Sequence, residues 1–193
     1  MLRRLYDWTL ALAGHRHALA ALAAVAFIES SVFPIPPDVM LIPMVLAAPT
    51  RAWRIAFVCT AASVLGGMAG YGIGALFFEQ VGRPVLDFYH HGDAFEAFRA
   101  DYDRWGAWAV FIFGLTFLPY KVITLFSGFA SLDIWAFTLA SILARGIRFY
   151  LVVALLWHFG VPIRAFIEAR LNLLFVIFAV LLIGGLVLVK LVF

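Results

Sequence analysis

Charged residues are scarce in this sequence. Only 13% of the 193 residues are Asp, Glu, Lys or Arg, whereas 65% are hydrophobic. Soluble globular domains carry about 25% charged and roughly 45–50% apolar residues, so this composition excludes an ordinary soluble domain. We predict one integral membrane domain built of α-helices, because a helix satisfies its own backbone hydrogen bonds inside a bilayer.

Cysteine and dense basic runs are also nearly absent. Cys59 is the single cysteine, so it forms no disulfide within the chain and we interpret it as a small packed residue. Without a basic run, nucleic-acid binding is not expected. His90 and His91 near Asp93 are not expected to bind a metal, because adjacent side chains point in different directions on a helix. We predict no metal site and no cofactor.

Two long apolar segments, residues 18–48 and 105–132, are each interrupted near the middle. The predicted breaks lie at Pro34, Pro36, Pro37, Pro119 and Gly128. The first segment is too long for one membrane helix of about 20 residues and too short for two crossings joined by a turn. We therefore predict two re-entrant hairpins, in which a helix enters the membrane partway and a second short helix returns.

Three uninterrupted apolar stretches predict full transmembrane helices over residues 55–78, 133–159 and 171–193. The first carries Gly66, Gly70 and Gly74, a spacing that allows close packing of helices. Residues 79–104 hold many of the charges and predict polar surface helices, and residues 1–17 predict an amphipathic interfacial helix. Because each hairpin precedes a full span, the order is typical of transporters with inverted repeats.

The short loops that carry arginines predict how the chain is oriented in the membrane. If both hairpins are re-entrant, all of these loops face one side, which the positive-inside rule assigns to the cytoplasm together with the N-terminus. The basic residues concerned are Arg3, Arg4, Arg16, Arg51, Arg54, Arg164 and Arg170. If only one hairpin crossed completely, this agreement would be lost.

Three cations lie within apolar segments and are candidate ligands for an anionic substrate. Arg145 and Arg148 are three residues apart and therefore share one helix face. Guanidinium groups bind phosphate through paired hydrogen bonds, so this face suits a phosphate headgroup. Lys121 adds a point charge beside the second break, and Thr124 and Ser127 follow as hydrogen-bond donors.

Two acids, Glu29 and Asp38, flank the first break. We predict that they couple transport to protons, because desolvation favours the neutral form of an unpaired carboxylate. The alternative is that they pair with Arg145 or Arg148 only to hold the hairpins together. A serine hydrolase is not expected, because no histidine is placed to activate a serine. We predict no catalytic residues.

Four motifs carry a resemblance to a known family. They are Glu29–Asp38 with its prolines, the glycine-rich stretch 66–74, Phe117–Thr124 with Pro119-Tyr120-Lys121, and Ala144–Phe149 with Arg145-Gly146-Ile147-Arg148. Together they resemble the DedA family of bacterial inner-membrane proteins, also called the SNARE-associated or VTT-domain family, and most closely its YqaA-like branch. Many members have Gly and an acid after the proline where this chain has Pro37 and Asp38, and other branches carry arginine at Lys121.

The resemblance implies facing re-entrant hairpins in a multi-pass protein of the bacterial inner membrane. It also implies proton-dependent translocation of undecaprenyl phosphate or phospholipids, with Glu29 and Asp38 as the acids and Arg145 and Arg148 as the bases. The expected partners are phosphate-bearing lipids and protons, and a homo-oligomer is left open. Two alternatives stand beside this reading: a proton-linked ion or drug transporter, and a non-catalytic membrane scaffold for envelope homeostasis.

Overall fold

The computed structural model describes residues 17–31, 36–84, 88, 92–116, 120–160 and 162. All secondary-structure elements in these residues are helical, which confirms the all-α prediction. Several predicted features lie outside the described residues. They are the helix over 1–17 apart from its last residue, the span over 171–193, and the breaks at Pro34 and Pro119.

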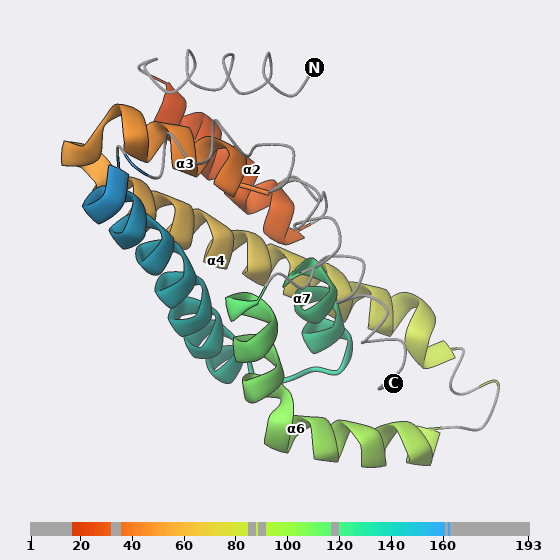
Figure 1. Ribbon diagram of the computed structural model, residues 1–193. Helices are drawn as coiled ribbons and strands as arrows, with labels where there is room; N and C mark the ends of the chain where they lie inside the picture. The colour runs from red at the N-terminus through yellow and green to blue at the C-terminus, as the bar shows by residue number, and fades with distance from the viewer. Residues whose placement is uncertain are drawn as a thin grey trace.

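The first half of the chain contains three helices. They are α2 (Ala18–Ser31), α3 (Asp38–Ala47) and α4 (Ala52–Phe77), and a π-helical turn, Phe78–Gly82, extends α4. Pro37 is the N-cap of α3, and Asp38 lies in its first turn. A negative charge there interacts favourably with the helix dipole and stabilises the helix. A 3-10 turn, Pro49–Arg51, then leads into α4. Figure 1 shows α2 and α3 lying along the first part of α4.

The second half repeats this order of elements. Helix α6 (Gly92–Leu115) is followed by the ten-residue helix α7 (Tyr120–Phe129) and then by the long helix Ile134–Gly160. Helix α6 starts inside the segment predicted as polar surface and continues into the predicted hairpin, so residue 104 is not a structural boundary. Figure 1 shows that α6 bends, so its charged first part and its apolar second part run in different directions.

The turn after α7 corrects the predicted break at Gly128. Gly128 lies within α7, and the chain leaves the helix at Ser131, whose φ of 53° is left-handed. The backbone N–H of Leu132 donates to the Ser127 carbonyl, and that of Ser131 donates to Gly128, as in a Schellman motif. Asp133 then caps the next helix, since its Oδ1 accepts from the Ala136 N–H at 2.8 Å.

Helix α4 lies between α2 and α7 and packs closely against both. A Cβ atom added to Gly66 would overlap the Phe27 carbonyl of α2, and one added to Gly74 would overlap the Leu125 carbonyl of α7. Gly128 of α7 meets the backbone of α4 in the same way. Glycine at 128 is therefore explained by close approach of two helices and not by a chain reversal.

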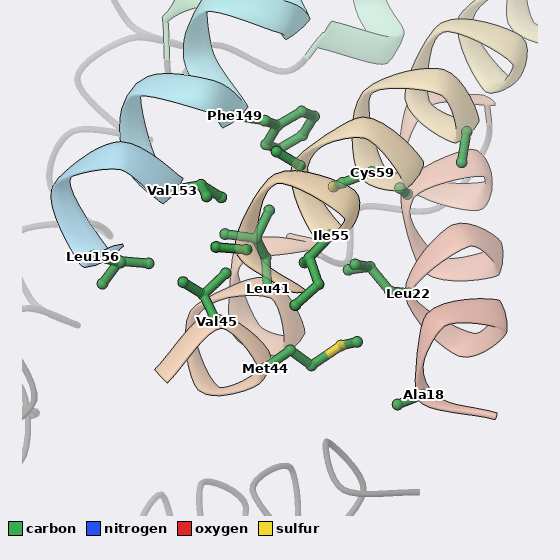
Figure 2. Packing of buried hydrophobic residues seen from close by; sticks show 14 residues of the cluster. Ala18, Leu22, Leu41, Met44, Val45, Ile55, Cys59, Phe149, Val153 and Leu156 are labelled. Carbon is green, nitrogen blue, oxygen red and sulfur yellow. The ribbon is translucent and has the colours of Figure 1, made fainter. Parts of the chain in front are cut away.

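An apolar core joins α2, α3, α4 and the helix Ile134–Gly160. Figure 2 shows Leu22, Leu41, Ile55, Phe149 and Val153, one or two from each helix, converging there. Two helical stretches, Pro49–Gly82 and Ile134–Gly160, are long and apolar enough to cross a membrane by length and composition. The first includes the predicted span over 55–78, and the second matches the predicted span over 133–159 with a shift of one residue. The core fixes the first hairpin against the helix that carries the two arginines.

Candidate functional site

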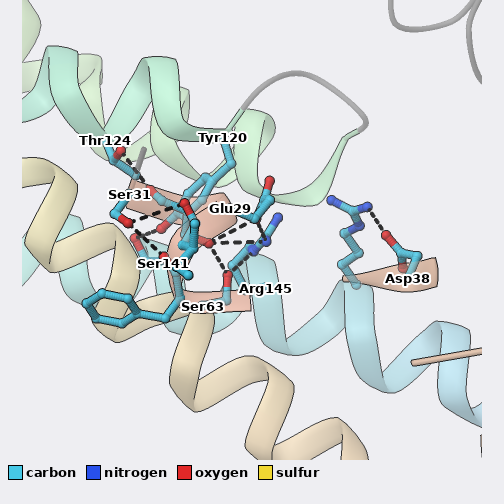
Figure 3. Close-up of polar contacts among 12 residues, drawn as sticks. Glu29, Ser31, Asp38, Ser63, Tyr120, Thr124, Ser141 and Arg145 are labelled. Carbon is cyan, nitrogen blue, oxygen red and sulfur yellow. Dashed lines mark hydrogen bonds and ion pairs between the residues drawn. The ribbon is translucent and has the colours of Figure 1, made fainter. Parts of the chain in front are cut away.

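Arg145 is the centre of a buried polar cluster between the two halves of the chain (Figure 3). Its side chain is 0% exposed. Its Nη2 donates to Glu29 Oε2 at 2.6 Å, and its Nε donates to Ser63 Oγ at 2.6 Å. The cation is therefore held by the end of α2 on one side and by the middle of α4 on another. An ionised buried pair of this kind depends on its hydrogen bonds to offset desolvation.

Two serine hydroxyls close a ring around this ion pair. Ser63 Oγ lies 2.7 Å from Ser30 Oγ, and Ser30 Oγ donates to Glu29 Oε2 at 3.0 Å. Because the Arg145 Nε–H can only donate, Ser63 accepts from it and has its own proton available for Ser30. Ser30 in turn directs its proton to Glu29. The hydrogen bonds from Arg145, Ser63 and Ser30 are therefore all oriented toward the Glu29 carboxylate.

Aromatic rings enclose the guanidinium group. Its carbon lies 4.7 Å from the centre of the Tyr120 ring and 4.8 Å from that of Phe149, distances at which cation–π attraction acts. The Tyr120 hydroxyl donates to Ser141 Oγ at 2.6 Å. Tyr120 is the first residue of α7, so the start of the second hairpin's short helix contacts the cation that the first hairpin neutralises.

One donor of this cluster remains unused. Arg145 Nη1 is buried and has no hydrogen-bond partner among the described residues. Leaving a buried donor without a partner costs roughly 1–3 kcal/mol, and more when the group is charged. The orphan donor shows where an acceptor atom from a ligand would be favoured.

A second ion pair lies on the same helix face. Arg148 Nη2 donates to Asp38 Oδ2 at 2.8 Å. Their side chains are 13% and 21% exposed, so this pair is more accessible than the first. Together the two pairs confirm the hypothesis that the acids beside the first break meet the two arginines. They join Ile134–Gly160 to both limbs of the first hairpin.

The other predicted site residues lie elsewhere. Thr124 Oγ1 donates to the Ser30 carbonyl at 3.2 Å, so it borders the cluster through the backbone of α2. Ser127 Oγ is 3.0 Å from the Tyr102 hydroxyl of α6 and does not hydrogen-bond to either arginine. The Lys121 ammonium makes no hydrogen bond or ion pair within the described part of the chain. Direct substrate contact by these three residues stays a prediction.

The sequence interpretation missed Ser63, Tyr120 and Ser141. A signal for Ser63 was present, because it is three residues before Gly66 and therefore lies on the same helix face as the glycines. A polar residue in that small-residue series meets a partner helix at close range. Tyr120 belongs to the Pro119-Tyr120-Lys121 motif of the family resemblance, but nothing in the sequence indicated its contact with Arg145. Ser141 is an ordinary residue of an apolar segment until the fold brings it to Tyr120.

Metal binding is not indicated within the described residues, where no group of three or more His, Cys, Asp or Glu side chains comes together. His90 and His91 lie outside them. The buried cluster itself consists of one cation, one carboxylate and hydroxyl groups, a set better suited to an anion than to a metal ion.

Comparison with known proteins gives relatives but no activity. The chain is 38% identical over 151 residues to an uncharacterized protein of Haemophilus influenzae, and the match covers 78% of each chain. It is 35% identical over 151 residues to an uncharacterized homologue from Histophilus somni, again over 78% of each. No protein-family model matches the chain, and no solved structure matches it.

Proposed function

The chain belongs to the same family as these two uncharacterized bacterial proteins, and we propose that it transports a lipid with a phosphate headgroup across the bacterial inner membrane. The substrate class comprises undecaprenyl phosphate and phospholipids. The protein acts as a transporter and not as an enzyme. The observation that carries the proposal is the buried Arg145, which has an unused donor and lies one helical turn from Arg148.

The spacing of tryptophans supports the membrane placement. Trp135 and Trp157 lie near opposite ends of Ile134–Gly160 and are 74% and 52% exposed. At ~1.5 Å per residue the helix rises about 33 Å between them. A bilayer has a hydrocarbon core of about 30 Å, and tryptophan is enriched at both of its interfaces. Large apolar side chains such as Leu139, Leu143 and Leu151 are exposed between the two, as expected of a surface that faces lipid.

The repeated order of elements supports an inverted-repeat transporter. In each half a helix, a ten-residue helix and a long helix follow one another. We assign the two broken segments to re-entrant hairpins that enter from opposite faces and meet at Arg145. In transporters of this architecture the substrate binds near the midplane, beside the broken helices. Movement of one hairpin against the other would then expose Arg145 to each face in turn.

Protons enter this proposal through Glu29 and Asp38. Each acid neutralises an arginine in the structure. Protonation of an acid removes its charge and makes the arginine available to a phosphate, so protons and substrate exchange at the same guanidinium groups. This favours lipid phosphate over a cation or a neutral drug, because the exchange requires an anionic substrate.

Headgroup translocation in proteoliposomes tests the proposal. We expect Arg145→Gln to abolish movement of a fluorescent phospholipid or prenyl phosphate between leaflets, because the buried cation is lost. Arg83→Gln is the matched control, since Arg83 is an exposed arginine paired with Glu79 on the helix surface, and it should translocate at the wild-type rate. Wild-type translocation by Arg145→Gln, or none by the wild-type protein with either lipid, would contradict the proposal.

A membrane scaffold is the second candidate, and the complete pairing of the two arginines with acids favours it. Structural ion pairs need no exchange with a substrate. The variant that combines Glu29→Gln with Arg145→Gln separates the two functions. A scaffold would keep its effect on envelope integrity in cells, whereas a transporter that binds phosphate through Arg145 would lose it.

A further inference from the structure

The charge of Arg145 is balanced by Glu29, but its buried Nη1 has no hydrogen-bond partner among the described residues. We propose that a headgroup oxygen accepts a hydrogen bond from Arg145 Nη1, and that Glu29 takes up one proton from water as the headgroup binds. This inference rests on the proposed function and specifies how its site works. It means that the proton and the lipid bind together, and that Glu29 does not leave the cluster to make room for the phosphate.

The charge balance of the site requires the proton. Arg145 and Glu29 carry one charge each, so the pair is neutral. A phosphodiester would add a negative charge beside a guanidinium whose positive charge is already balanced, at a position that is 0% exposed. A buried charge without a partner is strongly unfavourable. Protonation of Glu29 restores neutrality, because the guanidinium then has the phosphate as its single counter-ion.

Among the described residues, the other ionisable groups around the pair are neutral, balanced by one another, or not in contact with Glu29. Tyr120 of α7 and Cys59 of α4 are neutral side chains in their protonated forms, and both are buried. Asp38 and Arg148 balance each other's charges. Lys121 of α7 makes no ion pair or hydrogen bond to Glu29 within the described residues. Glu29 is therefore the group that can change charge where the headgroup arrives.

The serine pair can serve both protonation states of Glu29. When Glu29 is ionised, Ser63 donates to Ser30 and Ser30 donates to the carboxylate. When Glu29 is neutral, its own hydroxyl donates to Ser30 Oγ. Ser30 then rotates its proton toward Ser63 Oγ, which still accepts from Arg145 Nε. Two hydroxyl rotations suffice without movement of a heavy atom, because each hydroxyl is both donor and acceptor: Ser30 turns its proton toward Ser63, and Ser63 turns its own proton out of the ring.

Exposure sets the order of events. The Glu29 side chain is 16% exposed and that of Arg145 is 0% exposed. Glu29 is therefore the more accessible partner of the pair, whereas contact between a headgroup and Arg145 needs the surrounding helices to shift. Neutral Glu29 binds the guanidinium more weakly than the carboxylate does, since the bond loses its ionic component. Protonation thus weakens the contact between Glu29 and the guanidinium, while the neutral carboxyl group stays in the cluster through its hydrogen bond to Ser30.

Calorimetric titration of the purified protein with dihexanoylphosphatidylglycerol tests the inference. This lipid carries one negative charge throughout neutral pH, so any proton taken up is bound by the protein. Titrations in two buffers of different ionisation enthalpy should give an uptake of about one proton per lipid. By linkage, the affinity should fall by about tenfold per pH unit where Glu29 is ionised in the free protein. Dihexanoylglycerol, which lacks the phosphate, should neither bind at this site nor take up a proton.

Two variants locate the proton. In Glu29→Gln the site is permanently neutral, so we expect binding without proton uptake and with little dependence on pH. In Glu79→Gln, which changes an exposed acid paired with Arg83, the uptake of one proton should remain, because the proton resides on Glu29. Binding by the wild type without proton uptake, or uptake that persists in Glu29→Gln, would overturn the inference. Failure to bind either this lipid or a prenyl monophosphate would instead contradict the proposed function.

Discussion

The Glu29–Arg145 pair should be one of the strongest single interactions in the protein, and a double-mutant cycle measures it. The changes are Glu29→Leu and Arg145→Met, which replace each charged side chain with an apolar one of similar size. Breaking a buried ion pair by removing one partner costs about 3–5 kcal/mol, whereas replacing both partners is often neutral. We therefore expect each single variant to be destabilised and the double variant to recover most of the loss.

The two single variants should not be equally destabilised. Glu29→Leu leaves a guanidinium that is 0% exposed and always charged, with the neutral hydroxyls of Ser63 and Ser30 as its side-chain acceptors among the described residues. Arg145→Met leaves a carboxyl group that is 16% exposed and can take up a proton. The cost of Glu29→Leu should therefore lie at the upper end of the range, and that of Arg145→Met at or below its lower end.

The matched control is the Glu79–Arg83 pair. Its oxygen–nitrogen distance of 3.0 Å is similar to the 2.6 Å of the buried pair, but its side chains are 57% and 58% exposed. Exposed pairs one helical turn apart contribute about 0.3–0.5 kcal/mol. The measurement is reversible unfolding in mixed detergent micelles, followed by circular dichroism. A coupling energy for Glu29 and Arg145 no larger than that for Glu79 and Arg83 would refute the reasoning.

Two further predictions concern the contacts of α4. Gly74→Ala should lower stability by about 1–3 kcal/mol through overpacking, because its Cβ would overlap the Leu125 carbonyl, whereas Gly72→Ala, which meets nothing within 4 Å, should not. The thermal midpoints of the two variants in detergent give the comparison, and equal midpoints would be evidence against a tight α4–α7 contact. Tyr71→Phe removes the 2.6 Å hydrogen bond to the Leu132 carbonyl and should cost about 1 kcal/mol by the same assay. An unchanged midpoint would show that water or another donor replaces the hydroxyl.

The sequence was sufficient to predict the pairing of acids and bases. Glu29, Asp38, Arg145 and Arg148 stand out because charge is rare in apolar segments and costly to bury there. Such groups must find one another, so their pairing follows from energetics alone. Which acid meets which base depends on the offset between helices, and the sequence left that open. The structure assigns Glu29 to Arg145 and Asp38 to Arg148.

The roles of the small and polar neighbours could not be predicted in the same way. Gly128 was placed among the breaks, but it lies within α7, where it meets the backbone of α4 across the interface. Likewise Ser127 was expected at the substrate, and in the structure its hydroxyl lies 3.0 Å from that of Tyr102 of α6, a contact that the sequence did not indicate. Neither a serine hydroxyl nor a glycine favours one location in a membrane helix by its own chemistry. Its function depends on a neighbour that only the fold specifies.

The position of the cluster along the helices connects the fold to the proposed exchange of protons and lipid. Arg145 is the twelfth residue of Ile134–Gly160, and Ser63 is the twelfth residue of Ala52–Phe77. The two residues that touch at 2.6 Å are therefore at equivalent places in the two halves. If the halves are inverted repeats, as we propose, equivalent positions meet only near their common axis, which lies in the membrane plane.

At ~1.5 Å per residue, the twelfth position is about 17 Å from the start of a helix that is about 40 Å long. In the proposed arrangement the guanidinium would lie close to the bilayer midplane, where a charge without a counter-ion is least favourable. At that depth Arg145 needs a negative partner in every state of a transport cycle. Glu29 supplies it in the structure, and a phosphate can replace Glu29 only as Glu29 is neutralised. A proton-free exchange would leave either one negative charge too many or Arg145 unpaired at the midplane, which is why lipid movement by this site should stop when Glu29 cannot be protonated.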